Sequence, residues 1–249
     1  MESVIFSRRD QYELQYLNPI IFYRAIESNN GSPDNVLIGL DVKANLLQQI
    51  QLYGQLVLDE FSLSEITDGI GWWGNKYGIQ GGFKYIDAFG TDNLDLQVEY
   101  NTVRPYTYSH NDGTANYTHY NQPLAHPLGS NFKEVIGIVR VQPIPRLALN
   151  AKFVHSTFGA DSNDVNLGGN IFLDNTSHPN DFGNETGQGV ETNLNQMDIR
   201  ASYMARHNIY VDLNLTLGDL KTEGIGEKQK RNYAGLSVRM NFPQKDLDY

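Results

Sequence analysis

The stretch Ile209-Tyr-Val-Asp-Leu-Asn-Leu-Thr-Leu217 alternates between aliphatic residues and residues that are mostly polar. Its aliphatic positions run from Ile209 to Leu217 in steps of two, and the positions between them include Asp212 and Asn214. Neighbouring side chains of a β-strand point to opposite faces of the sheet, so a period of two indicates a strand with one apolar face. The sequence therefore predicts a strand over 209–217.

The same alternation recurs in eight further stretches, which are 36–42, 50–58, 77–85, 94–100, 135–141, 147–153, 197–203 and 234–242. No charged residue occupies the apolar set of any stretch. The opposite set carries Asp41, Lys84, Asp95, Glu99, Arg140, Lys152, Asp198, Arg200, Asp212 and Arg239. A lipid-facing surface excludes charge in this way. A soluble sandwich or small soluble barrel can show the same pattern, with the charged face in water.

The connections between these stretches favour the membrane alternative, because they alternate between short and long. The short ones are Ala44–Gln49, Ile86–Asn93, Gln142–Arg146 and Met204–Asn208, and the long ones are Asp59–Lys76, Asn101–Glu134, Val154–Gln196 and Gly218–Tyr233. A meander whose long loops all lie at one end is typical of outer-membrane barrels. Ten residues at roughly 3.3 Å each, tilted by about 40°, also span about 25 Å, the height of an outer-membrane apolar band.

The pattern thus predicts an all-β protein, an antiparallel meander that forms a transmembrane β-barrel of about nine or ten strands. Residues 1–249 are expected to form a single domain. Residues 3–8 are a weakly patterned tenth strand. A short helix is expected near residues 18–28, because Asn18 suits an N-cap, Pro19 suits the first helical position and Gly31 ends the pattern.

Composition excludes several classes of protein. The chain has 249 residues and a net charge of −10, which disfavours a nucleic-acid binder. It has no cysteine, which excludes disulfide frameworks, cysteine-zinc sites and thiol catalysis. Its mean hydropathy of −0.45 resembles that of a soluble protein, but 15 tyrosines and 23 glycines suit strands and turns. Residues 1–8 lack the pattern of a signal peptide, so we expect part of a longer exported chain rather than a cytoplasmic protein.

Two short motifs resemble known binding loops, and both are better explained otherwise. Gly69-Ile-Gly-Trp-Trp-Gly74 matches a dinucleotide fingerprint, but a strand follows it where a helix is required, so we interpret the match as chance. The segments 161–166 and 174–181 resemble calcium loops, but Asn166 and Phe172 stand where an EF-hand needs Gly and Glu. Solvated acidic loops are the simpler interpretation, and we expect no metal or cofactor.

The sequence contains no compact catalytic motif of the metalloprotease, serine-hydrolase or P-loop kind, so we expect no enzyme. Three of the six histidines, His110, His119 and His126, lie in the expected loop 101–134. A loop cluster of this kind can bind a metal or act as a base. Hydrogen bonding within a folded loop is the interpretation we prefer.

Aromatic residues concentrate in the expected long loops, beside amide and guanidinium groups that suit sugar hydroxyls. The alternative is that these rings form an interfacial girdle or pack the loops on the barrel rim. For Trp72 and Trp73 the girdle is slightly favoured, and for the tyrosines the two interpretations are even. The candidate polysaccharide-binding residues are Trp72, Trp73, Asn75, Arg104, Tyr106, Tyr108, His110, His119, Tyr120, Asn121, Gln122 and His126.

Several longer segments resemble the Wzi-like capsule-assembly proteins of the outer membrane. The resemblance covers most of residues 12–242, and its clearest segments are 16–27, 32–41, 53–61, 71–80, 99–108 and 119–131. It implies a large single-chain barrel of which this chain is the C-terminal half. It also implies lectin-like binding of capsular polysaccharide without catalysis, and one related protein serves surface gliding.

The sequence therefore predicts a non-enzymatic protein of the outer membrane that takes part in the attachment of capsule or exopolysaccharide, or in gliding motility. Its expected partners are outer-membrane lipid, surface polysaccharide and, in the second case, proteins of the gliding machinery. One alternative is a pore or transport channel lined by the charged face. A hydrolase at the rim is a weaker alternative, because it requires a nucleophile–base pair or two facing carboxylates.

Overall fold

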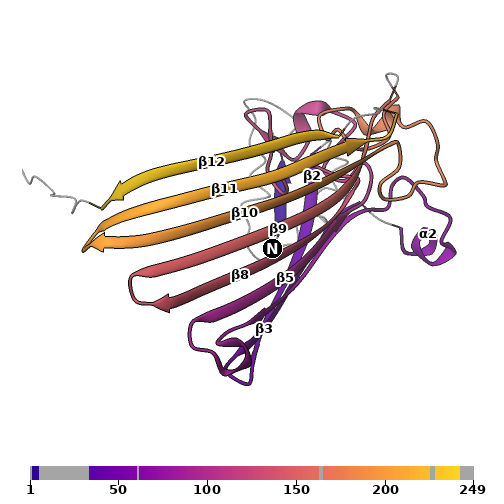
Figure 1. Ribbon diagram of the computed structural model, residues 1–249. Coiled ribbons are helices and arrows are strands. Elements are labelled where there is room, and N and C mark those ends of the chain that lie inside the picture. Colours follow the sequence, from indigo (N-terminus) through magenta and orange to yellow (C-terminus); the bar gives the residue numbers. More distant parts are fainter. Residues whose placement is uncertain (1, 6–33, 61, 163–164, 225–227, 242–249) are drawn as a thin grey trace, which may run out of the picture.

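The chain folds around one ten-stranded antiparallel sheet whose strands follow each other in sequence order (Figure 1). The computed structural model describes residues 2–5, 34–60, 62–162, 165–224 and 228–241. The strands are β1 (Glu2–Ile5), β2 (Asn35–Leu46), β3 (Ile50–Glu60), β4 (Lys76–Tyr85), β5 (Leu94–Val103), β8 (Phe132–Ile144), β9 (Leu147–Ala160), β10 (Val190–Arg206), β11 (Ile209–Thr222) and β12 (Gln229–Met240). The two-residue strands β6 (Thr118–His119) and β7 (Gln122–Pro123) form a separate hairpin.

The predicted all-β antiparallel meander is confirmed, and all nine predicted strands are present. The tenth strand is β1, which ends at Ile5 in the described part of the chain. The helix expected near residues 18–28 lies outside the described residues. Figure 1 shows a single curled sheet, and its edge strands β1 and β12 are not paired with each other in the described residues, so a closed barrel is not seen.

The strands extend further into the expected long loops than the apolar alternation does. β10, for example, begins at Val190 rather than at Met197, and its first residues pair with the end of β9 up to Ala160. Backbone hydrogen bonds need no apolar side chains, and polar pairs continue the ladder. Thr157 Oγ1 donates to Asn193 Oδ1 over 2.7 Å across these two strands. The long loops are therefore shorter than predicted.

The predicted alternation of short and long connections is confirmed, and it separates the two ends of the sheet. Figure 1 shows the tight turns at one end and the long loops gathered at the other. The turn between β10 and β11 has only two residues, His207 and Asn208, and Asn208 adopts a left-handed conformation with φ of 62°. The long loops contain the helix α2 (Leu63–Asp68) and the 3-10 turns η3 (Gly113–Ala115) and η4 (Asn175–Ser177), which the sequence did not predict.

The register places every apolar set on the same face of the sheet. One hydrogen-bonded row passes through β4, β5, β8, β9, β10 and β11 by way of Phe83, Val98, Gly137, Phe153, Met197 and Leu217. A neighbouring row on the other face joins Asp95, Arg140, Asn150, Arg200 and Asn214 in the same manner. We call these two surfaces the apolar face and the polar face.

The apolar face exposes many of its side chains, and the polar face buries some of its own. On the apolar face Leu40 is 60% exposed, and Val98 and Leu213 are each 54% exposed. On the polar face Ser156 is completely buried, and Asp212 is 5% exposed. The buried polar groups have partners, as buried polar groups require: Arg239 pairs with Asp212, and Ser156 donates to a glutamate. Among the described residues no helix has the length and apolar character needed to cross a membrane.

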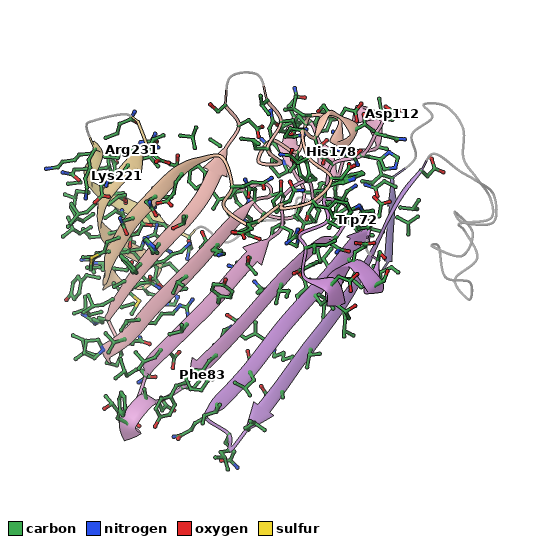
Figure 2. All side chains as sticks on the ribbon, turned by 90° about the vertical axis from the view of Figure 1, so that its right-hand side faces the viewer. Trp72, Phe83, Asp112, His178, Lys221 and Arg231 are labelled. Atoms are coloured by element: carbon green, nitrogen blue, oxygen red, sulfur yellow. The ribbon has the colours of Figure 1, made fainter. Side chains whose placement is uncertain are left out.

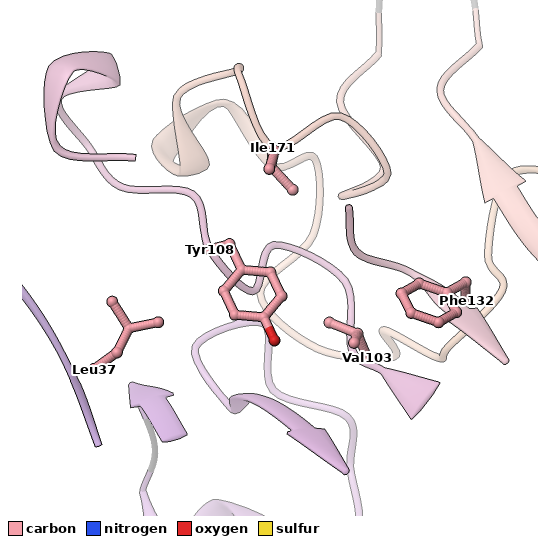
Figure 3. Packing of buried hydrophobic residues seen from close by; sticks show 5 residues of the cluster. All are labelled: Leu37, Val103, Tyr108, Phe132 and Ile171. Atoms are coloured by element: carbon pink, nitrogen blue, oxygen red, sulfur yellow. The ribbon is translucent and has the colours of Figure 1, made fainter. Parts of the chain in front are cut away.

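A small hydrophobic core lies on the polar face near the long-loop end. Leu37, Val103 and Phe132 from the sheet meet Tyr108 and Ile171 from two long loops (Figure 3). Phe132 is completely buried, and the ring of His126 stacks on it at 4.4 Å. Gly78 leaves room for Tyr108, because a Cβ atom at Gly78 would lie 3.0 Å from the tyrosine hydroxyl. This cluster fastens the long loops to the sheet.

Replacing Phe132 with alanine should lower the free energy of unfolding by about 3–5 kcal/mol, the usual cost of truncating a buried phenylalanine. Chemical denaturation measures the loss. The control is Tyr120→Ala, because Tyr120 is 88% exposed and its removal should change the free energy of unfolding by less than about 0.5 kcal/mol. Similar small losses in both variants would contradict the assignment of this cluster as the core.

Candidate functional site

The long loops 104–131 and 161–189 fold together into one unit at the end of the sheet, which we call the loop cap. Its backbone is tied across loops, since Tyr106 N donates to Gly168 O over 3.1 Å. Side chains add further ties, because Ser130 Oγ donates to Gly168 O over 2.6 Å and Asn175 Nδ2 donates to Ser109 O over 3.0 Å. Figure 2 shows Trp72, His178 and Asp112 together at this end of the molecule, with Phe83 far away near the turns.

Three aromatic rings form the centre of the loop cap. Trp73 stacks on His178 with ring centroids 4.1 Å apart, and Tyr106 contacts both rings edge-on. Lys76 Nζ lies 5.1 Å from the centre of the Trp73 ring and forms an ion pair of 2.9 Å with Glu60. Tyr106 is 1% exposed, and its hydroxyl donates to a backbone carbonyl in the loop cap. These rings therefore pack the cap together.

Arg104 joins the Trp72–Trp73 segment to the loop cap. Its Nε donates to Asn75 O over 2.8 Å, and its Nη2 donates to Trp72 O over 3.4 Å and to Asn184 O over 3.1 Å. The guanidinium thus satisfies carbonyl groups from two loops at once, which its planar fork of donors suits. Asn75 is also buried, and its side-chain oxygen accepts a hydrogen bond from Ser62 N.

A second group of predicted residues lies at the exposed tip of the loop. The β6–β7 hairpin turns at Tyr120 and Asn121, both with positive φ, and the Tyr120 ring is 88% exposed. The only ring contact of Tyr120 in the described residues is with His119, at 4.3 Å. Asn121 and Gln122 are exposed beside it. The tip thus presents one aromatic face next to amide groups and an imidazole.

His126 belongs to a buried hydrogen-bond network. The Glu134 carboxylate accepts hydrogen bonds from Asn101 Nδ2 at 3.1 Å and from Ser156 Oγ at 2.9 Å, and it meets His126 Nε2 at 3.1 Å. Leu128 N donates to His126 Nδ1, so the ring proton lies on Nε2. A serine nucleophile needs a base that accepts its hydroxyl proton and a path to substrate. Ser156 donates to the carboxylate instead and is completely buried.

The environment of the cap keeps three of its titratable rings, those of Tyr106, Tyr108 and His110, neutral. Burial raises the pKa of Tyr106 to about 12, and the charge of Asp161 acts in the same direction. Burial also raises the pKa of Tyr108. For His110, burial and the nearby Lys76 both lower the pKa, so the imidazole carries no charge near neutral pH. These groups therefore contribute packing and hydrogen bonds rather than charge.

The two calcium-like segments use their aspartates as local caps. Asp161 Oδ1 accepts a hydrogen bond from Leu167 N over 2.7 Å, and Asp174 Oδ1 accepts from both the backbone and the hydroxyl of Thr176. Within the described ranges, no three His, Asp or Glu side chains come together in a way that could hold a metal ion. One carboxylate oxygen of each of these two aspartates therefore accepts hydrogen bonds within a turn.

The structure divides the predicted residues into an inner and an outer group. Trp73, Asn75, Arg104, Tyr106 and Tyr108 lie within the cap or at its attachment to the sheet. Trp72 is half-buried beside Trp73, and His110 and His126 are half-buried in the cap. His119, Tyr120, Asn121 and Gln122 lie together on the exposed hairpin. The described structure brings the two groups to the same end of the sheet but not to one pocket.

Sequence reasoning missed the partners that the second long loop supplies. His178 lies in the segment 174–181, which we interpreted as a solvated acidic loop, yet its ring covers Trp73. Gln188 donates to Leu167 O and Asn184 Oδ1, and Asn184 accepts from Arg104 through its backbone. These residues are about 80 positions from Arg104, and no local pattern in the sequence links them.

Replacing Arg104 with lysine should loosen the Trp72–Trp73 segment, because lysine has all its donors on one nitrogen, whereas Arg104 reaches the three carbonyls from two nitrogens of a planar fork. Each hydrogen bond lost from a charged group costs about 1.5–3 kcal/mol. The chain has only two tryptophans, so intrinsic fluorescence reports on this segment directly. We expect a red shift of the tryptophan emission and a lower unfolding midpoint. The control variant Lys152→Gln, on the polar face, should keep the original spectrum. An unshifted spectrum in Arg104→Lys would contradict the role of Arg104 in joining the Trp72–Trp73 segment to the loop cap.

No protein-family model matches the chain, and no curated protein matches its sequence. Three features of the chain itself therefore bear on its function: the exposed apolar face of the sheet, the packed cap and the exposed tip at Tyr120.

Proposed function

We propose that the chain forms part of the wall of a β-barrel in an outer membrane, and that its loop tip binds a surface polysaccharide without catalysis. The observation that carries the first half is the large apolar face, which is exposed in row after row of the sheet. A water-soluble monomer rarely exposes apolar surface of this extent. Lipid in contact with the apolar face and water or polar loops at the polar face would satisfy both surfaces.

The upper edge of the apolar face supports a membrane further, because its position shifts in one direction, step by step, along the sheet. We define this edge in each strand as the last apolar outward residue before the polar positions on the long-loop side. The edge lies at Leu58 in β3, Tyr77 in β4, Tyr100 in β5, Val135 in β8, Phe153 in β9, Met197 in β10, Leu217 in β11 and Ala234 in β12. Relative to the hydrogen-bonded rows, the edge descends towards β12.

Strands that are tilted relative to a flat membrane surface produce such a shift, because the surface then crosses each successive strand at a lower row. The row that ends at Ala234 passes through Ile50 of β3, which lies eight residues, or about 26 Å, below Leu58. From β3 to β12 there are seven strand spacings, or about 34 Å. A fall of about 26 Å over about 34 Å gives a tilt of roughly 38°, within the roughly 35–45° of outer-membrane strands.

The height of the apolar face fits the same interpretation. In β11 the apolar set runs from Ile209 to Leu217, about 26 Å along the strand and about 21 Å in height at this tilt. Aromatic residues lie at both limits, with Tyr100 at the upper edge and Tyr203 near the turns, each exposed by more than two fifths. Aromatic girdles at both limits of an apolar band of about 25 Å are typical of outer-membrane barrels.

The binding half of the proposal rests on the β6–β7 hairpin. The Tyr120 ring offers an open apolar face, and Asn121, Gln122 and His119 offer hydrogen-bond groups around it. A sugar ring presents C–H groups on its face and hydroxyls at its edge, which this combination suits. The rings of Tyr106 and Tyr108 are buried within the same loop and stabilise it. The Ser156 hydroxyl bonds to Glu134 but is completely buried and so lacks a path to substrate, which favours binding over hydrolysis.

Replacing Leu213 with arginine should destabilise the protein in lipid bilayers by about 2–4 kcal/mol, because Leu213 lies at the middle of the apolar set of β11. The matched control is Thr216→Arg on the same strand. Thr216 lies on the polar face and donates to Asp198, which can pair with the new cation. Unfolding midpoints in phospholipid vesicles measure the difference.

Equal effects of the two arginines would contradict a lipid-facing apolar side. A chain that stays monodisperse in buffer without detergent would contradict it as well, because an exposed apolar face should associate in water. A steady ion conductance in planar bilayers would favour the pore alternative over a capped wall.

Replacing Tyr120 with alanine should weaken binding to extracted capsular polysaccharide roughly tenfold, the effect of losing about 1.4 kcal/mol. The fold should be unaffected, because Tyr120 is almost fully exposed. Isothermal titration with detergent-solubilised protein measures the affinity, and the buried-site variant Tyr106→Phe is the control. An unchanged affinity in Tyr120→Ala, or no binding by the parent protein, would contradict the hairpin as the binding site.

A further inference from the structure

A cavity of about 280 Å³ lies on the polar face, between strands β1–β5 and β8 on one side and the loop 104–131 on the other. The sheet lines it with Leu37, Val103 and Phe132 among others, and the loop adds Tyr108 (Figure 3). At roughly 30 Å³ for each water, the cavity has room for about nine waters or for one group the size of a sugar ring. The exposed β6–β7 hairpin is not part of the described lining, so the cavity is separate from the tip.

Three amide side chains follow each other along one hydrogen-bonded row of the sheet, and all three line the cavity. The row passes through Gln55 of β3, Gln80 of β4 and Asn101 of β5. Neighbouring strands are about 4.8 Å apart, so the three positions span about 10 Å. The spacing of neighbouring amides is comparable with that of hydroxyls on non-adjacent carbons of a sugar ring.

Carboxylates hold the amino groups of these three amides. Gln55 Nε2 donates to Asp41 Oδ1 over 2.6 Å, and Gln80 Nε2 donates to Glu99 Oε1 over 3.1 Å. Asn101 Nδ2 donates to Glu99 Oε1 over 3.0 Å. Because an amide carries its donors on nitrogen and its acceptor on oxygen, the carbonyl oxygens are the groups left to bind a ligand. No donor among the described residues bonds to these three oxygens.

Aromatic rings form another part of the lining. Tyr108 and Tyr117 stack on each other with ring centroids 5.8 Å apart, and both residues line the cavity. His126 and Phe132 form a second stacked pair, and they line it as well. Apolar rings together with hydrogen-bond acceptors match the two kinds of surface on a sugar, its C–H faces and its hydroxyl edge.

The charge around the cavity favours an uncharged ligand. Its described lining contains no lysine, arginine, aspartate or glutamate. The glutamates beside the amides are engaged: Glu99 accepts hydrogen bonds from two of the amides and from the Tyr53 hydroxyl, and Glu134 accepts from Ser156 Oγ. A buried charge without a partner is costly. A carboxylate on the ligand would in addition meet carbonyl oxygens, which repel it.

We propose that this cavity binds one uncharged sugar unit, whose hydroxyls donate to the carbonyl oxygens of Gln55, Gln80 and Asn101 and whose C–H face lies against the aromatic rings. This inference rests on the proposed polysaccharide binding and adds a second site with a defined class of sugar. Because the cavity has room for about one ring, the bound unit is a chain end or a side branch of a polysaccharide rather than an internal stretch.

Isothermal titration with methyl glycosides tests the cavity, in a detergent that has no sugar headgroup. The titrations use the Tyr120→Ala variant, because it lacks the aromatic face of the tip. At least one of the methyl glycosides of glucose, galactose and mannose should bind saturably. The methyl glycoside of the corresponding uronic acid should bind at least about tenfold more weakly, because its carboxylate finds no partner. Adding Gln55→Met and Gln80→Met removes two acceptors at nearly constant side-chain length and should weaken binding about tenfold.

The matched control adds Gln51→Met and Gln97→Met, which make the same change on the polar face outside the described lining and should keep the affinity. Val57→Phe is a second test, because Val57 lines the cavity and a larger ring should fill it and abolish binding.

Equal losses in the two glutamine pairs, or an unchanged affinity in Val57→Phe, would overturn the cavity as a sugar site. Equal affinities for the neutral and the acidic glycoside would overturn it as well. If none of the three neutral glycosides binds while the parent protein still binds capsular polysaccharide, the cavity proposal fails and the proposed function stands. Absence of polysaccharide binding by the parent protein would instead contradict the proposed function.

Discussion

The agreement between strand register and side-chain polarity is the constraint on which the rest of the structure depends. Between the upper edge and the turns, the rows of the apolar face carry no charged residue from β4 through to β11, and the charged residues of these strands lie on the polar face. A slip of one residue in any pair would turn a whole strand over and place its charges among the apolar rows. The register is therefore specified by the two contrasting surfaces, although neither surface is a conventional core.

Because several polar side chains of the polar face are buried, hydrogen bonds supply much of the interior. Glu134 joins Asn101, Ser156 and His126 in one network, and Arg239 pairs with Asp212 near the opposite edge of the sheet. Buried polar groups are costly unless each finds a partner. Apolar packing of the familiar kind is confined to the small cluster around Phe132. That cluster attaches the loops, and the loops in turn carry the exposed tip.

Aromatic residues that look alike in the sequence have three separate roles. Tyr108 fills the space above Gly78 and anchors a loop. Trp73 and Tyr106 meet His178 and hold two loops together. Tyr120 turns outward at the hairpin, where His119 supplies its only ring contact within the described part of the chain. Only the last role leaves an aromatic face available to a ligand, so the candidate binding surface contracts from the whole loop to its tip.

The sequence by itself determined the strands, their two faces and the alternation of short and long connections, because a period of two and the length of a turn are local properties of the chain. It also predicted which loops carry aromatic and amide groups. Only the tertiary structure decided which aromatic rings are buried, since the burial of Tyr106 depends on Gly168 and Gln188, which lie 60 to 80 residues away. The level upper edge that runs from Leu58 to Ala234 likewise required the register, because the relative height of two strands is set by their pairing and not by either strand alone.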